Sequence, residues 1–191
     1  MMRFMKKLLL ILGSTLILGA CGGNTTTSDL SCTSAYWDGT VGTCLPDGWH
    51  VVDRADLDQR GIPGEVLVAF QSDAPVSGQL ATVIVTREPL TQPMDSEVYS
   101  EVSIESVRGL PGYELIDERT VTVDGATITL HIFKAQPRTD EPETRFYQVS
   151  IASGQSGYTY TAATPVSVEK DLENQVLLIV RNATLHGPEG E

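Results

Sequence analysis

The stretch "TVTVDGATITLHIF" (120–133) determines which kind of sheet this sequence builds. Its Asp124-Gly125 pair suits a two-residue hairpin turn, which places Val123 opposite Ala126. Successive side chains of a strand point to opposite faces, so this register puts aliphatic residues on one side of the hairpin and threonines on the other. The predicted apolar side consists of Val121, Val123, Ile128, Leu130 and Ile132.

Further segments on both sides of this hairpin are predicted to be strands. Nearly continuous apolar runs are typical of strands that are covered on both faces. Two such runs are "EVLVAFQ" (65–71) and "ATVIVTR" (81–87). Patterns rich in aromatic and β-branched residues predict the remaining strands: a run from Trp49 through Val52 after "LPDG", then "TRFYQVSIA" (144–152) and "GYTYTAA" (157–163).

Two segments are predicted to be helices. The first covers 95–110, with Asp95 or Ser96 as its cap and with Tyr99, Val102, Val107 and Leu110 on one face, although Ile104 falls off that face. The second begins with Thr164 as cap and Pro165 in the first position. Its apolar stripe is Val168, Leu172, Val176, Ile179 and Ala183. Strands interrupted by one helix and closed by another predict an α+β domain, in which helices pack against an antiparallel sheet.

The N-terminus has the layout of an export signal. Arg3, Lys6 and Lys7 precede the mostly apolar stretch 8–20, which is shorter than the roughly 20 residues that a membrane-spanning helix needs. "LGAC" (18–21) resembles the bacterial lipobox, and this resemblance implies cleavage before Cys21 and attachment of a diacylglycerol to its sulfur. An ordinary secretory signal followed by a chance cysteine is the alternative.

This interpretation divides the chain into a signal peptide (1–20), a flexible tether (21–31), one domain (32–186) and a short tail (187–191). The full chain has a net charge of −12; loss of the signal removes three basic residues and no acidic one, which leaves −15. Such a surface repels nucleic acids and anionic headgroups, because it has no basic excess to neutralise phosphates. We therefore expect no nucleic-acid partner, and contact with the membrane only through the lipid.

Cys32 and Cys44 remain as a pair, which in an exported chain suggests a disulfide. A hairpin with a three-residue loop through Trp37, Asp38 and Gly39 would place Cys32 directly opposite Cys44, within the span of a disulfide. A two-residue turn would instead place Cys32 opposite Leu45. Two free thiols are the remaining alternative.

The order of the elements is similar to that of the PsbP-like fold, an α/β/α sandwich. The resemblance covers roughly 44–185 and depends on "LPDGW", "LPGYELIDERTVTVDG", "RFYQVSIA" and the terminal amphipathic helix. Bacterial members include DcrB-like and LpqN-like lipoproteins, while other members serve a photosystem or nuclear import. The resemblance therefore implies a fold and no particular activity.

Candidate chemistry is sparse. His50, His131 and His186 are isolated from other ligands at metal-binding spacing. The segment from Asp56 begins like a calcium loop, but Arg60 and Leu67 stand at ligand positions, so we interpret it as a solvated turn. We predict no catalytic residue, metal or cofactor.

An acidic loop is the predicted interaction site. The segment "QPRTDEPETR" (136–145) joins two predicted strands, and its acidic residues are Asp140, Glu141 and Glu143. A solvated hairpin tip is the alternative.

Taken together, the sequence predicts a non-catalytic binding or accessory protein of the bacterial cell envelope. We expect it to be anchored by lipid to the cell membrane or outer membrane, with its domain on the extracytoplasmic side and an unknown envelope protein or ligand as partner. Two alternatives stay open: a hydrolase-type envelope enzyme whose site is assembled only in three dimensions, and a small-ligand carrier, which would need an enclosed apolar cavity.

Overall fold

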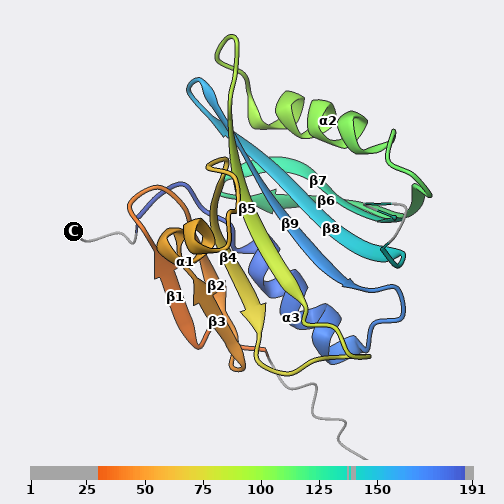
Figure 1. The fold of residues 1–191 in the computed structure, drawn as a ribbon. Coiled ribbons are helices and arrows are strands. Elements are labelled where there is room, and N and C mark those ends of the chain that lie inside the picture. Colours follow the sequence, from red (N-terminus) through yellow and green to blue (C-terminus); the bar gives the residue numbers. More distant parts are fainter. Residues whose placement is uncertain (1–29, 137, 139–140, 188–191) are drawn as a thin grey trace, which may run out of the picture.

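A seven-stranded antiparallel sheet is the framework of the structure, a computed structural model that describes residues 30–136, 138 and 141–187 (Figure 1). The strand order is β3-β4-β5-β9-β8-β7-β6. The strand bounds are β3 Trp49–Val52, β4 Val66–Ser72, β5 Thr82–Pro89, β6 Glu114–Val123, β7 Ala126–Ala135, β8 Thr144–Ser153 and β9 Ser156–Pro165. Three helices pack on this sheet: α1 Arg54–Gln59, α2 Ser96–Val107 and α3 Lys170–Arg181. The predicted α+β class and antiparallel sheet are therefore confirmed.

The central hairpin has the predicted register. Val123 pairs with Ala126 and Val121 pairs with Ile128 across the β6–β7 turn. Asp124 and Gly125 both have positive φ, at 51° and 78°, as a two-residue hairpin turn requires. The strand β6 begins at Glu114, six residues before the stretch that was predicted, and a bulge lies between Leu115 and Asp117.

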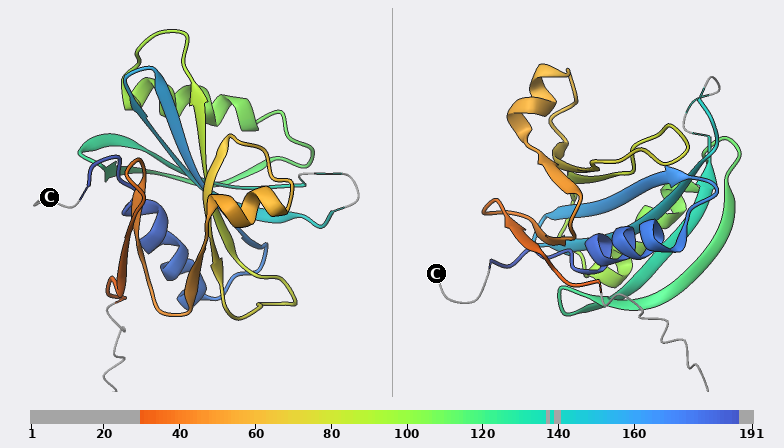
Figure 2. Two further views of the ribbon diagram at one scale, coloured as in Figure 1. Left: turned by 60° about the vertical axis from the view of Figure 1, so that its left-hand side comes forward. Right: turned by 90° about the horizontal axis from the view of Figure 1, so that it is seen from below.

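The main core lies between the sheet and α3 (Figure 2). The apolar stripe of this helix is confirmed, because Leu172, Val176, Ile179 and Ala183 are all buried in that core. The predicted start of the helix was wrong, since α3 begins at Lys170 with Glu169 as its cap. Thr164 and Pro165 instead end β9, where they pair with Arg145 and Thr144 of β8, so the sheet takes the residues that would otherwise begin a helix.

On the opposite face of the sheet, α2 packs against β7 and β8. Its predicted position is confirmed, and its predicted apolar face is confirmed in part, because Tyr99 is buried and Val107 and Leu110 are half-buried, whereas Val102 is exposed. The buried residues of α2 are Tyr99, Ser100, Ser103 and Ile104, whereas Val98 and Val102 are 47% and 53% exposed. The sheet beneath α2 carries polar side chains, so this helix buries hydroxyl groups where an apolar stripe was expected.

The segment predicted as a solvated turn around Asp56 contains the short helix α1. Asp53 caps this helix by accepting a hydrogen bond from the backbone nitrogen of Asp56, and Arg54 forms an ion pair with Asp58. Leu57 then packs with Val52 and Ala69 in a small second core, on the face of the sheet opposite α3.

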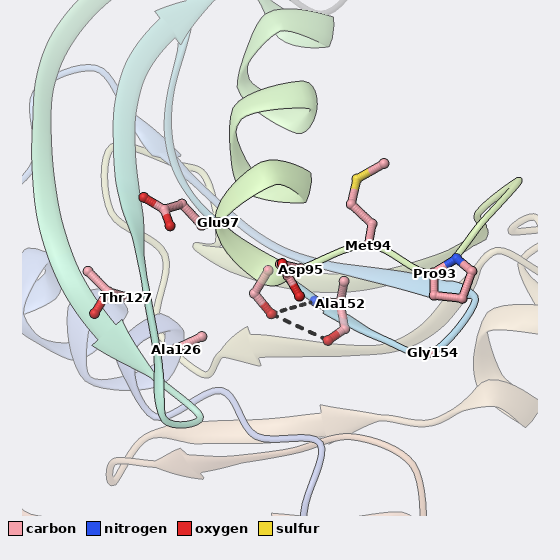
Figure 3. A pocket seen from close by; sticks show the side chains of 9 residues that line it. Pro93, Met94, Asp95, Glu97, Ala126, Thr127, Ala152 and Gly154 are labelled. Carbon is pink, nitrogen blue, oxygen red and sulfur yellow. Dashed lines mark hydrogen bonds between the residues drawn. The ribbon is translucent and has the colours of Figure 1, made fainter.

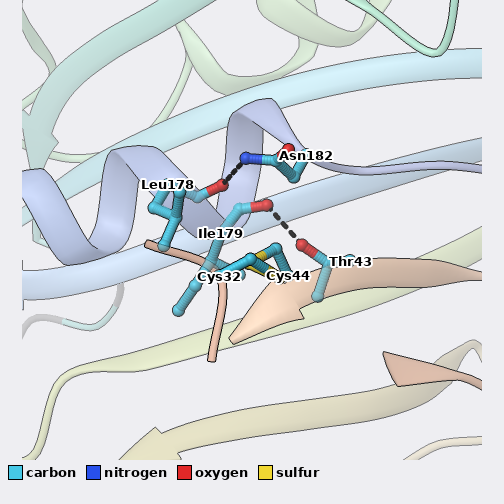
Figure 4. Close-up of a disulfide and its surroundings, with 6 residues drawn as sticks. All are labelled: Cys32, Thr43, Cys44, Leu178, Ile179 and Asn182. Atoms are coloured by element: carbon cyan, nitrogen blue, oxygen red, sulfur yellow. Dashed lines mark hydrogen bonds between the residues drawn. A yellow bond between two sulfur atoms is a disulfide. The ribbon is translucent and has the colours of Figure 1, made fainter. Parts of the chain in front are cut away.

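A separate two-stranded hairpin, β1 (Ser34–Trp37) and β2 (Gly42–Leu45), carries the disulfide between Cys32 and Cys44 (Figure 4). The predicted register was wrong by three residues, because Ala35 pairs with Cys44. The loop is longer than predicted, since the Asp38 carboxylate accepts hydrogen bonds from the backbone nitrogens of Thr40 and Val41, both at 2.8 Å. Cys32 consequently lies before the start of β1, with its Cα 5.4 Å from that of Cys44.

This hairpin is fastened to the C-terminal part of the chain. Gly42 and Thr184 exchange two backbone hydrogen bonds of 2.8 and 2.9 Å, and the Thr43 hydroxyl donates to the carbonyl oxygen of Ile179 at 2.6 Å. A Cβ atom on Gly42 would lie 2.7 Å from the carbonyl oxygen of Tyr36, so no larger residue fits without a shift of the backbone.

Within the described ranges, no helix is long and apolar enough to cross a membrane. The predicted signal peptide, the lipidation residue Cys21 and most of the tether lie outside the described residues.

Candidate functional site

The face of the sheet beneath α2 carries several buried polar side chains, in contrast to the apolar face beneath α3. Along β8, alternation sends Tyr147, Val149 and Ile151 into the main core. The residues between them point the other way, and they include Gln148 and Ser150, which are 4% and 2% exposed. On the neighbouring strand β9, Thr159 is also buried on the α2 side. Three polar side chains therefore meet one helix in the middle of a sheet.

Ser103 of α2 is the centre of the resulting network. Its Oγ accepts hydrogen bonds from Gln148 Nε2 at 2.6 Å and from Ser150 Oγ at 2.8 Å. Ser150 Oγ and Thr159 Oγ1 are 3.0 Å apart, and Thr159 Oγ1 is in turn 3.2 Å from the Tyr99 hydroxyl. Buried polar groups that are mutually satisfied are stiff, so this layer fixes the position of α2 over the sheet.

Tyr99 connects the buried layer to the surface. Its hydroxyl donates a hydrogen bond to Glu88 Oε1 at 2.7 Å, and Glu88 is exposed at the end of β5. Burial raises the pKa of Tyr99, so the phenol keeps its proton and acts as a donor. The ring sits directly on Gly157 of β9, where a Cβ atom would be 2.2 Å from the tyrosine Cζ. Gly157 thus provides the space into which Tyr99 fits.

A cleft of about 360 Å³ opens beside this network, along one side of α2. Its polar lining includes Glu65, Arg87, Glu88, Ser103, Gln148 and Thr161. Phe133 and Phe146, whose rings stack with centroids 5.1 Å apart, form an aromatic part of the wall. The cleft therefore offers hydrogen-bond donors, acceptors and an apolar surface to one bound molecule.

A second cluster surrounds His131, which is fully buried on the same face of the sheet. Its Nδ1 lies 3.0 Å from Glu118 Oε1, and its Nε2 lies 3.1 Å from the Tyr113 hydroxyl. Burial lowers the pKa of His131, although the nearby Glu118 carboxylate opposes that change. We interpret this cluster as a neutral histidine at neutral pH that ties β7 to β6 and to the loop after α2.

A larger hollow, of about 690 Å³, lies where α2 begins (Figure 3). It is bounded by the start of α2, by Ala126 and Thr127 of β7, and by the β8–β9 turn. Asp95 and Glu97 bring two carboxylates to its wall, and Glu97 projects toward the β6–β7 hairpin. Ser96 closes one side, because its hydroxyl bonds to both backbone groups of Ala152, at 3.0 and 3.3 Å.

The predicted interaction residues lie elsewhere, in the loop between β7 and β8. Asp140 is outside the described residues. Glu143 is 3.9 Å from Lys134 Nζ, and Glu141 is 3.7 Å from Arg138 Nε, so basic neighbours offset both of these carboxylates. None of the described residues of this loop lines the cleft.

The described residues offer no assembled catalytic group of the kinds considered from the sequence. No serine or threonine hydroxyl in them bonds to a histidine ring: His50 and His186 pair with aspartates, and His131 contacts Glu118 and Tyr113. Nor do these residues contain a group of three or more side chains that could hold a metal ion. The cleft and the hollow are both open to solvent, unlike the enclosed apolar cavity expected of a carrier.

Sequence reasoning missed the polar layer because its residues come from four separate segments. A signal was nevertheless present: "YQVSIA" in β8 and "GYTYTA" in β9 alternate strictly, so each polar residue had to share one face. The hydroxyls of α2 had no such signal, because Ser100 and Ser103 are ordinary on an exposed helix.

Comparison with solved structures shows that the chain has a PsbP-like fold. LpqN, a protein involved in cell envelope biogenesis of Mycobacterium tuberculosis, aligns over 79% of this chain and 88% of its own with a TM-score of 0.57 and 14% identity. Cyanobacterial PsbP (CyanoP) from Synechocystis sp. PCC 6803 aligns over 88% of this chain and 99% of its own with a TM-score of 0.54 and 15% identity. No family model matches the sequence. No curated protein matches it either.

Proposed function

We propose that this protein is a lipid-anchored accessory protein of the cell envelope, which binds a ligand or partner in the cleft beside α2 without changing it chemically. The polar layer is the observation that supports this proposal. Its hydroxyl and amide groups are already held in place by one another, so binding there needs little rearrangement. The likeness to LpqN, which is described as involved in envelope biogenesis, supports the location.

The cleft is suited to recognition more than to bond cleavage. Ser103 accepts two hydrogen bonds, and within the described part of the chain no imidazole or carboxylate contacts its oxygen to remove its proton. A serine in that position lacks the adjacent base that activates a nucleophile. Arg87 and Glu88 at the rim supply opposite charges, which orient a bound molecule without reacting with it.

The anchor is tested separately, through Cys21. Metabolic labelling with a palmitate analogue is expected to tag the wild-type chain and not the Cys21→Ser variant. That variant is expected to leave the membrane fraction or to stay as an uncut precursor. Equal labelling of the two chains, or unchanged processing and fractionation, would contradict lipid attachment.

Binding in the cleft is tested with a photo-crosslinking amino acid at Arg87, which is exposed on the cleft wall. The control carries the same group at Asp47, an exposed turn residue that does not line the cleft. We expect crosslinking to add a defined mass to the chain with the group at position 87 and not to the control. The added mass is expected to correspond to the unmodified ligand. Cleaved products in the adduct would favour the hydrolase alternative, and the absence of any adduct at 87 would refute binding in the cleft.

A further inference from the structure

The outer face of α2 carries two exposed valines among its acidic residues, where a helix on a sheet is normally polar. Val98 and Val102 lie one turn apart in the middle of the helix and are 47% and 53% exposed. At the same time Ser100 and Ser103 are 2% and 8% exposed against the sheet. Figure 1 shows that this helix lies on the outside of the sheet, and among the described helices and strands none packs on its outer face. The valine pair is therefore a ridge that no described part of the chain covers.

A row of glutamates runs beside the valine ridge. Glu97, Glu101 and Glu105 are spaced by four residues, so they lie one above another on the helix. Like charges at this spacing repel one another and destabilise a helix. Arg108 offsets only the last of them, at 2.8 Å from Glu105. Across the described chain, no basic side chain lies within ion-pair distance of Glu97 or Glu101.

The hollow at the start of α2 continues this acidic surface. Glu97 faces into it and Asp95 stands on its wall, while Pro93 and Met94 provide an apolar border (Figure 3). A volume of about 690 Å³ admits a long side chain from another molecule. A lysine or arginine there would have its charge beside two carboxylates and its methylene stem along Met94.

We propose that the outer face of α2 docks a basic amphipathic helix of a partner protein. Apolar residues of the partner cover Val98 and Val102, and its lysines or arginines pair with Glu97 and Glu101, in the way that flanking charges select partners in coiled coils. Charge complementarity decides among the occupants. A second copy of this chain would bring the same glutamates against each other, and an anionic membrane would be repelled. This site is distinct from the cleft, so each can fail without the other.

A leucine–lysine peptide of about 18 residues, with leucines at helical spacing, serves as the probe. It is titrated by fluorescence anisotropy against the full chain held in phosphatidylcholine nanodiscs, with empty nanodiscs as background. The variants are Val98→Ser with Val102→Ser, and Glu97→Gln with Glu101→Gln. We expect each pair to weaken binding about tenfold, since two half-buried valines or two surface ion pairs are lost.

A matched variant separates this site from the overall negative charge. Asp47→Asn with Glu169→Gln removes the same two charges from exposed positions outside α2, and it is expected to leave the affinity within about twofold. All changed residues are exposed, so circular dichroism is expected to show an unaltered fold. An equal loss of affinity in the control pair, no loss in either α2 pair, or no binding of the peptide at all would overturn the proposal.

Discussion

Breaking the Cys32–Cys44 disulfide should cost about 3 kcal/mol of folding free energy. The cysteines are 12 residues apart, and the entropy of closing a loop of that length in the unfolded chain gives roughly this value. Cys32→Ser is the sharper variant, because Cys32 is exposed whereas Cys44 is 5% exposed and contributes to the core. A Cys21→Ser background removes the third thiol from both proteins.

The assay is urea unfolding, followed by the fluorescence of Trp37 and Trp49. With a denaturant dependence of about 2 kcal/mol per molar, the midpoint of the Cys32→Ser variant is expected to fall by about 1.5 M. For a domain of this size the melting temperature is expected to fall by about 6–12 °C. Reductant should lower the midpoint of the parent protein to that of the variant, and it should leave the variant unchanged. Equal midpoints for parent and variant under oxidising conditions, or an equal effect of reductant on both, would refute this reasoning.

Three further predictions concern the two faces of the sheet. Gly157→Ala is expected to displace the ring of Tyr99 and destabilise the protein by about 1–3 kcal/mol, visible in thermal melts and in the near-ultraviolet signal of tyrosine, because the added Cβ would overlap that ring. Since burial lowers the pKa of His131, the unfolded chain takes up a proton at this residue before the folded protein does, so the His131 contribution to stability is expected to fall as the pH drops from 7.5 to 5.5. Comparing the parent protein with His131→Gln isolates this contribution, because the raised pKa of His186 acts in the opposite direction; an identical pH profile for the two proteins would contradict it. Ile179→Ala in α3 is expected to lower the free energy of unfolding by about 2–5 kcal/mol, because it leaves a cavity in the core. Val102→Ala, on the exposed face of α2, is expected to change it by no more than about 0.5 kcal/mol. Similar losses for the two variants in urea unfolding would show that the buried face of α3 or the exposed face of α2 is misassigned.

Local signals predicted the strands, and most strands pair with a neighbour along the chain, although β5 pairs with the distant β9. The Asp124-Gly125 turn fixed the β6–β7 register, and that register placed every aliphatic residue on the correct face. The α3 stripe succeeded for the same reason, because it faces an apolar sheet. The start of α3 failed because Thr164 and Pro165 are equally suitable for a helix start and for a strand end.

On α2 the prediction misplaced Val102 and missed the buried serines, for a physical reason that also explains the missed site. Helix periodicity predicts which side is apolar, and it assumes that the sheet below is apolar too. Beneath α2 the sheet presents Gln148, Ser150 and Thr159, and Ser103 of the helix turns inward to bond with them. For Cys32 and Cys44 the predicted disulfide is present, although the strand register from which it was predicted does not occur. The disulfide needs only proximity, which the longer loop also provides.

The disulfide also determines how this domain responds to mechanical force. A force applied to the chain before Cys32 is transmitted through the disulfide to Cys44 in β2. The hydrogen bond from the Thr43 hydroxyl to the backbone of α3 holds β2 in place. Residues 33–43 lie within the covalent loop, so the pull does not reach β1 as a peeling force. Resistance then comes from the bonds of β2 to the end of the chain at Thr184, which must break together. With this arrangement, a force applied to the chain before Cys32 does not unravel the domain from its first strand.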